Sequence, residues 1–128
     1  MTRGLADTSV FIARETGRRL RRDLLPEELA VSVITIGEIR AGVLAANDLA
    51  TRDRRLQTLT QALALNPIPV DDQVAEAWSR LRLLLRDSGQ GMAVNDSWIA
   101  ATAMSLSVAV VTQDDDYVDI PGLEVMIV

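Results

Sequence analysis

The chain has no cysteine, no histidine and no lysine among its 128 residues, and all thirteen of its basic residues are arginine. The absence of cysteine excludes disulfides, thiolate metal sites and thiol nucleophiles. The absence of histidine and lysine excludes imidazole acid–base catalysis, Schiff-base chemistry and the lysine of a Walker phosphate-binding loop. Any catalytic chemistry therefore depends on carboxylates, hydroxyls, amides and guanidinium groups.

Aromatic side chains and long apolar runs are also scarce. Two Trp, one Tyr and one Phe are too few for a domain that binds RNA by stacking its bases. No apolar run approaches the roughly 20 residues of a membrane span, and Asp7 interrupts the N-terminus before a signal peptide could form, so we expect a cytoplasmic protein without membrane contact. The net charge of −5 repels a polyanion, so a nucleic-acid substrate needs local arginines or a metal ion.

The apolar fraction of 48% is enough for the core of one domain that spans residues 1–128. Apolar runs predict strands at 5–6, 28–32, 68–70, 108–112 and 123–128. Periodic apolar residues predict helices at 10–25, bent or broken near Gly17, and at 34–46, 49–65, 71–87 and 94–106. Strands that alternate with helices are typical of an α/β fold with a parallel sheet covered on both faces.

Acidic side chains follow the predicted strands or lie within apolar helices. Asp7 and Asp114 come shortly after strands, whereas Glu38 and Asp96 lie on helices that could cover the same rim. Ligands of open parallel sheets bind outside the carboxyl ends of the strands. Buried acids are costly unless a positive charge joins them, and a divalent cation with oxygen ligands is the simplest such partner. The pattern therefore predicts an acidic metal site.

Each acid has a plainer interpretation when it is taken alone. Asp7 could cap the helix that follows it, Asp96 could be a first-turn acid favoured by the helix dipole, and Glu38 could be an ordinary exposed helix residue. The run from Asp114 to Asp116 could form a solvated turn. The metal-site hypothesis therefore rests on all of these acids mapping to one rim of the sheet.

Four segments, in their order along the chain, resemble the PIN-domain nucleases. They are Asp-Thr-Ser from Asp7, Gly-Glu-Ile-Arg-Ala-Gly from Gly37, Asn-Asp-Ser-Trp-Ile-Ala-Ala-Thr-Ala from Asn95, and Val-Val-Thr-Gln-Asp-Asp-Asp-Tyr from Val110. The resemblance is closest to the VapC toxins of bacterial and archaeal toxin–antitoxin modules, and it covers essentially the whole chain. It implies a PIN-like three-layer sandwich with a five-stranded parallel sheet flanked by helices.

The same resemblance implies a function and a set of site residues. The implied activity is that of a toxin, an endoribonuclease that hydrolyses RNA phosphodiester bonds with Mg²⁺ or Mn²⁺, and the implied partners are a cognate antitoxin and a second copy in a homodimer. The family's catalytic acids correspond to Asp7, Glu38, Asp96 and Asp114; the candidate metal ligands are Asp7, Asp96, Asp114 and Asp116. Many members place a final Asp-Phe one position further from the threonine than Asp116-Tyr117 stands from Thr112, which leaves the roles of Asp114 and Asp116 open.

Three further residues are candidates for supporting roles. Thr112 could orient a ligand by hydrogen bonding or be a plain strand threonine, and Asn95 could assist the site or cap its helix. Arg40 neighbours Glu38 in the sequence and is a candidate for binding substrate. Clusters of arginine at 14–22 and 52–55 could bind phosphates or form a solvated face that is salt-bridged to nearby acids.

Two alternatives share some of these features. A receiver-like interaction domain also has an acidic pocket on an α/β sheet, but it normally needs a lysine at its last strand, and this chain has none. A catalytically inactive PIN-like domain could keep the acids without the activity. Metal titration followed by an RNA cleavage assay would separate these classes.

Overall fold

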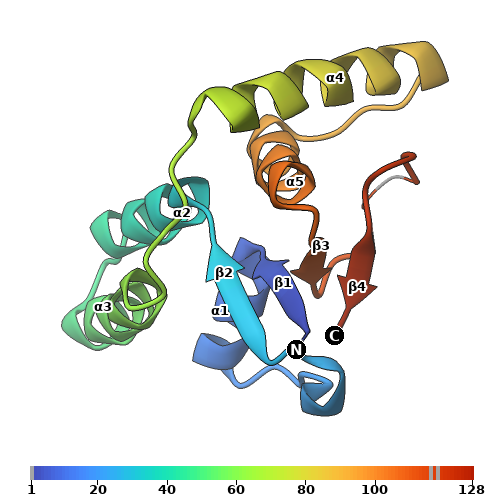
Figure 1. Cartoon of the computed structure of the whole chain (residues 1–128). Helices are drawn as coiled ribbons and strands as arrows, with labels where there is room; N and C mark the ends of the chain where they lie inside the picture. Colours follow the sequence, from blue (N-terminus) through green and yellow to red (C-terminus); the bar gives the residue numbers. More distant parts are fainter. Residues whose placement is uncertain (1, 116, 118) are drawn as a thin grey trace.

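Four parallel strands form the centre of the computed structural model, which describes residues 2–115, 117 and 119–128 (Figure 1). The strands are β1 (Arg3–Ala6), β2 (Glu28–Val31), β3 (Ala109–Thr112) and β4 (Val125–Ile127), and their order across the sheet is β2-β1-β3-β4. The helices are α1 (Thr8–Thr16), the 3-10 helix η1 (Arg22–Leu24), α2 (Val33–Leu44), α3 (Leu49–Leu63), α4 (Asp72–Ser88) and α5 (Val94–Leu106). The α/β class and the parallel sheet predicted from the sequence are confirmed.

Helices cover both faces of the sheet because neighbouring residues of a strand point to opposite sides. Ala6 and Val111 join a core with side chains of α1, α2 and α3. Leu5 and Val110 point the other way and join a second core with side chains of α4 and α5. Figure 1 shows these two groups of helices on either side of the strands, with α4 lying across α5. The result is the expected three-layer sandwich.

The prediction of a fifth strand at residues 68–70 is wrong in the described part of the chain. Ile68 makes an isolated parallel bridge to Ser32, in which its N–H donates to the Val31 carbonyl at 2.8 Å and its carbonyl accepts from Val33 at 3.0 Å. Pro67 and Pro69 flank Ile68, and proline has no N–H to extend a ladder. The pairing therefore stops after one residue, and β2 is an edge strand.

The break predicted near Gly17 is confirmed. Gly17 ends α1 with a left-handed backbone at φ 75°, which a glycine adopts without steric cost. The chain then turns through an irregular segment and η1 before β2 begins. None of the helices in the described part of the chain combines the length and apolarity needed to span a membrane.

The elements that carry the predicted acids converge at the carboxyl ends of two central strands. β1 ends at Ala6, one residue before Asp7, and β3 ends at Thr112, two residues before Asp114. The Asp7 N–H donates to the Val111 carbonyl at 2.9 Å, which joins the ends of these strands. Asp96 lies in the first turn of α5 and Glu38 in the middle of α2.

Candidate functional site

Asp7 lies at the junction of β1 and α1 with only 4% of its surface exposed. Its Oδ1 accepts hydrogen bonds from the Ser9 backbone N–H, at 3.0 Å, and from the Ser9 hydroxyl, so Asp7 does cap α1. Its Oδ2 accepts from the Thr112 hydroxyl at 2.6 Å. Three donors therefore orient one buried carboxylate at the rim of the sheet.

Thr112 is more than a plain strand threonine. Its side chain is fully buried, and its hydroxyl donates to Asp7 while accepting from the backbone N–H of Asp114 at 2.9 Å. The Ser9 hydroxyl lies 3.2 Å from the same oxygen and accepts from the Gln113 N–H at 2.9 Å. The hydroxyls of Thr112 and Ser9 thus each bond both to the Asp7 carboxylate and to a backbone N–H just after β3, which fixes the position of Asp7 relative to that segment.

Asp96 and Asp114 line a cavity of about 280 Å³, together with Gly91, Met92, Ala93 and Tyr117. Partial burial raises the pKa of the Asp96 carboxyl above its ordinary range, and the negative charges of Asp7, Glu38 and Asp114 raise it further. Each of the other three predicted acids therefore lies near enough to Asp96 for its charge to act on it. The structure thus brings together acids that are up to 107 positions apart in the chain, from Asp7 to Asp114.

Glu38 is half-buried and hydrogen-bonded, so the interpretation as an ordinary exposed helix residue is wrong. Its Oε1 accepts from the Thr8 hydroxyl at 2.7 Å, and that hydroxyl lies 3.1 Å from the hydroxyl of Thr35. Glu38 also lines a cavity of about 240 Å³ whose walls include Glu15 and Arg55. A second carboxylate at the rim is therefore positioned by the first residue of α1.

Tyr117 is a residue of the site to which the sequence interpretation assigned no role. Its hydroxyl is buried and has no hydrogen-bond partner among the described residues, although the Asp7 carboxylate lies close to it. Burial, followed by the negative charges of Asp7 and Asp96, raises the pKa of the Tyr117 hydroxyl far above its ordinary value. The hydroxyl therefore stays protonated and can only act as a neutral donor or acceptor.

Asn95 and Arg40, two further candidates, are exposed on α5 and α2. Asn95 is exposed on α5, and the helix cap is Ala93, so the capping interpretation of Asn95 is wrong. Arg40 is exposed on α2, two residues beyond Glu38 and hence on another side of the helix. Asp116 lies outside the described residues.

The chemistry of the acids fits a hard divalent cation. Carboxylate oxygens are the ligands that Mg²⁺ and Mn²⁺ prefer, and burial together with the negative charges of the other acids raises the pKa of Asp96. The acids described here do not form a ready-made cage, because no three of them stand close enough to hold one ion. The buried hydroxyl of Tyr117, which lines the same cavity as Asp96 and Asp114, has no hydrogen-bond partner among the described residues.

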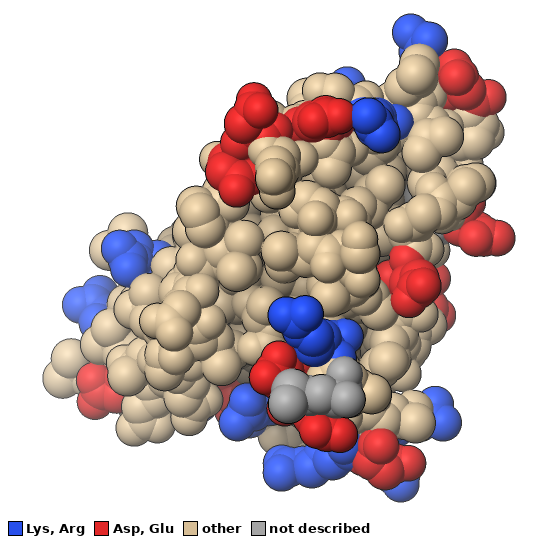
Figure 2. All heavy atoms as spheres, viewed as in Figure 1, with Lys and Arg blue, Asp and Glu red and all other residues tan. Residues whose placement is uncertain are grey.

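Few arginines form ion pairs with the acids that the structure describes. The three ion pairs between described residues are Arg3–Glu28, Arg80–Glu76 and Arg86–Asp87, and all are exposed. The alternative in which the arginine clusters at 14–22 and 52–55 pair with nearby acids has no ion pair to support it among the described residues. On the face shown in Figure 2, basic and acidic side chains intermingle around a broad uncharged area.

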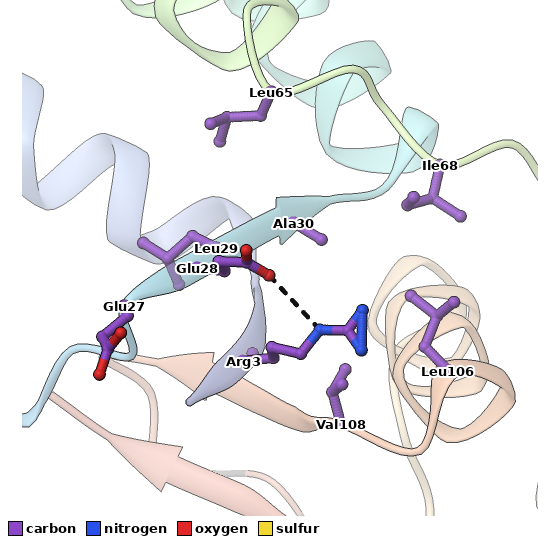
Figure 3. A pocket seen from close by; sticks show the side chains of 10 residues that line it. Arg3, Glu27, Glu28, Leu29, Ala30, Leu65, Ile68, Leu106 and Val108 are labelled. Carbon is purple, nitrogen blue, oxygen red and sulfur yellow. Dashed lines mark ion pairs between the residues drawn. The ribbon is translucent and has the colours of Figure 1, made fainter. Parts of the chain in front are cut away.

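A further cavity, of about 460 Å³, lies at the opposite, amino-terminal end of the strands. Figure 3 shows Arg3 and Glu28 joined by an ion pair between the apolar side chains of Leu106, Val108 and Ile68. Ligands of parallel sheets bind at the carboxyl ends of the strands. The acids of this cavity are Glu27 and Glu28, and Glu28 is already paired with Arg3. The acidic rim is therefore the candidate active site.

Comparison with known proteins agrees with this geometry. The family model described as PIN domain matches residues 5–123 of the chain. The chain belongs to the PIN-domain family. This PIN domain is 47% identical to Ribonuclease VapC5 of Mycobacterium tuberculosis over 119 residues, which cover 93% of the chain and 88% of the relative. It is 44% identical to Ribonuclease VapC4 of the same organism, with 97% and 95% covered.

A solved structure places the chain more closely within the family. The crystal structure of VapBC-5, a member of the VapBC family of toxin–antitoxin systems from Mycobacterium tuberculosis, contains a chain that superposes with a TM-score of 0.91. The two chains are 41% identical, and each is covered completely. The predicted resemblance to the VapC toxin family is confirmed, and the receiver-like alternative is wrong.

Proposed function

We propose that this PIN domain is the toxin of a toxin–antitoxin module and an endoribonuclease that hydrolyses RNA phosphodiester bonds. The observation that carries the proposal is the convergence of Asp7, Glu38, Asp96 and Asp114 at the carboxyl rim of the sheet, where burial and the charges of the other three raise the pKa of Asp96. The names Ribonuclease VapC5 and Ribonuclease VapC4 of its relatives support the choice of RNA as substrate.

We further propose that the acids bind Mg²⁺ or Mn²⁺. Asp7, Asp96 and Asp114 are the candidate ligands, with Asp116 as a further candidate, and such an ion would supply a Lewis acid and an activated water. Ser9 and Thr112 hold the Asp7 carboxylate toward the rim. Glu38, which Thr8 orients, is the candidate general base for an attacking water.

The proposed substrate and partners follow from the same assignment. Arg40 and Asn95 are exposed near the rim on α2 and α5, where they are candidates for contacting RNA. A small cognate antitoxin is the proposed protein partner, because the solved relative is described as part of a toxin–antitoxin system. We also propose a homodimer and a cytoplasmic location, where cellular RNA is available.

The decisive experiment is a cleavage assay on total bacterial RNA with purified protein. Cleavage is expected with Mg²⁺ or Mn²⁺, none is expected in EDTA, and the rate should return when the ion is restored. Mapping of the product ends distinguishes attack by water, which leaves a 5′-phosphate and a 3′-hydroxyl, from attack by the ribose 2′-hydroxyl, which leaves a cyclic phosphate. Full activity of metal-stripped protein in EDTA would contradict the metal proposal.

The matched control is Asp96→Asn, which keeps the size of the side chain and removes its charge. Loss of cleavage in this variant, with an unchanged circular dichroism spectrum, excludes a contaminating nuclease. Failure of the wild-type protein to cleave any RNA under all these conditions would favour the alternative of a catalytically inactive PIN-like interaction domain.

A further inference from the structure

The buried hydroxyl of Tyr117 has no described role in the fold. The ring packs against the core formed by α4 and α5, as a phenylalanine ring in its place would. The hydroxyl adds a polar group that is buried but not hydrogen-bonded within the described chain. Buried polar groups normally have a partner, so an unsatisfied one needs a reason.

The surroundings of Tyr117 favour a partner other than the described side chains. The side chain lines the 280 Å³ cavity together with Asp96 and Asp114. Asp7, the other acid close to the hydroxyl, already accepts hydrogen bonds on both of its oxygens, from Ser9 and Thr112. The hydroxyl of a tyrosine at the wall of an acidic cavity is a donor available to whatever fills that cavity.

We propose that Tyr117 is a positioning residue whose hydroxyl donates a hydrogen bond to an oxygen atom of the molecule that occupies the acidic cavity. That oxygen belongs either to a water that accompanies the divalent cation or to a phosphate group of the RNA. The inference rests on the proposed function, because it takes the acidic rim to be the metal and substrate site.

The test compares the wild-type protein with Tyr117→Phe by thermal unfolding and by titration calorimetry. In chelator, the variant should be at least as stable as the wild type, because only an unsatisfied hydroxyl has been removed. The dissociation constant of Mn²⁺ should rise about fivefold, the value of one ordinary hydrogen bond. If the increase appears only when inorganic phosphate is added with Mn²⁺, the partner is a phosphate oxygen; if it appears with Mn²⁺ alone, the partner is a water of the ion.

Thr102→Val is the matched control. Thr102 is also a buried hydroxyl, but it donates to the Trp98 carbonyl within α5, at 2.8 Å. Its loss should leave the affinity for Mn²⁺ unchanged, with and without phosphate.

Two results would overturn the inference while leaving the metal site in place. One is equal affinity of Tyr117→Phe and the wild type for Mn²⁺ in both arms. The other is a clear loss of stability of Tyr117→Phe in chelator, because it would show that the hydroxyl already has a partner within the free protein. If the wild-type protein itself fails to bind Mn²⁺, the proposed metal site fails, and this inference fails with it.

Discussion

Asp7 and Asp96 both lie at the carboxyl rim of the sheet, but Asp7 has hydrogen-bond donors around it whereas Asp96 has other acids near it. Asp7 accepts from three donors, on Ser9 and Thr112. Asp96 is surrounded mainly by negative charge, and burial together with the charges of Asp7, Glu38 and Asp114 raises the pKa of its carboxyl. The same substitution should therefore have opposite effects on stability at the two positions.

We expect Asp7→Asn and Asp96→Asn each to lower RNA cleavage by more than about 100-fold, the upper end of the loss seen when supporting residues of metal sites are removed. In chelator at neutral pH, Asp96→Asn should unfold at a higher temperature than the wild type. Asp7→Asn should be destabilised, by about 1.5–3 kcal/mol for a charge-assisted hydrogen bond that an amide cannot accept. Differential scanning calorimetry and single-turnover cleavage measure both effects. Wild-type cleavage by either variant would mean that the site is misplaced.

The pH dependence of stability provides a control for the origin of the Asp96 effect. The pKa of Asp96 is raised in the folded protein, so the folded state binds the proton more tightly than the unfolded state does. Its contribution to stability is full below the unfolded pKa and is lost as the pH rises through the folded pKa. The advantage of Asp96→Asn over the wild type in chelator should therefore shrink as the pH falls toward the ordinary range of an aspartate. An advantage that does not change with pH would contradict charge repulsion as its cause.

At the scale of elements, two glycines differ in their backbone conformation. Gly17 ends α1 with φ 75°, and Gly37 lies inside α2 with a helical backbone. A Cβ added at either position would meet no atom within 4 Å, so packing does not distinguish them. Backbone conformation alone should decide the effect of an alanine at each.

We expect Gly17→Ala to destabilise the protein by about 1–2 kcal/mol, because an L-residue with a side chain is strained in the left-handed region. Gly37→Ala should stabilise it by about 0.5–1 kcal/mol, because alanine has the higher helix propensity. Urea unfolding of the two variants measures both changes. An equal sign for the two would show that side-chain packing or the unfolded state dominates. A loss of RNA cleavage in a stabilised Gly37→Ala would indicate that Gly37 leaves room for substrate next to Glu38.

At the scale of the whole molecule, charge presents a difficulty for a protein that acts on RNA. The net charge is −5, and the candidate active site is itself acidic. The segment that follows α1 brings positive charge near the rim, because the Gln113 side chain donates to the Arg19 carbonyl at 2.9 Å. Gln113 in turn donates its backbone N–H to Ser9, beside Asp7. The exposed Arg19 is thus anchored close to the acids.

We expect Arg19→Ala to weaken RNA binding and to reduce its dependence on salt. Each phosphate contact to a single strand contributes about 0.7 to the slope of log affinity against log salt, so the slope should fall by about that amount. Binding of a single-stranded RNA oligonucleotide is measured in the Asp96→Asn background, which prevents cleavage. Arg86→Ala is the control, because Arg86 is exposed in the last turn of α4 and pairs with Asp87. Equal slopes for the two arginine variants would contradict a specific role for the segment after α1.

The sequence alone determined the features that depend on residues close together in the chain, such as helices, their caps and their breaks. Apolar periodicity predicted α2, α3, α4 and α5 with their approximate bounds, since a helix buries one stripe of side chains. It extended the first helix to residue 25, whereas α1 ends at Thr16. Asp7 caps α1 through the N–H of a residue only two positions away, and the break at Gly17 depends on the backbone freedom of that glycine itself. The strand–helix alternation then brought Asp7 and Asp114 to one rim, because all strands of a parallel sheet end at the same edge.

Only the tertiary structure decided how these acids are held. The hydrogen bonds from Thr112 to Asp7 and from Thr8 to Glu38 join residues 105 and 30 positions apart, and no local pattern predicts such pairs. The hydroxyl of Tyr117 became notable only when its burial and its lack of a partner were known. The missing fifth strand depends on both the sequence and the tertiary structure. The prolines beside Ile68 are visible in the sequence, but the packed chain decides that Ile68 pairs with Ser32, just after β2, in a single bridge.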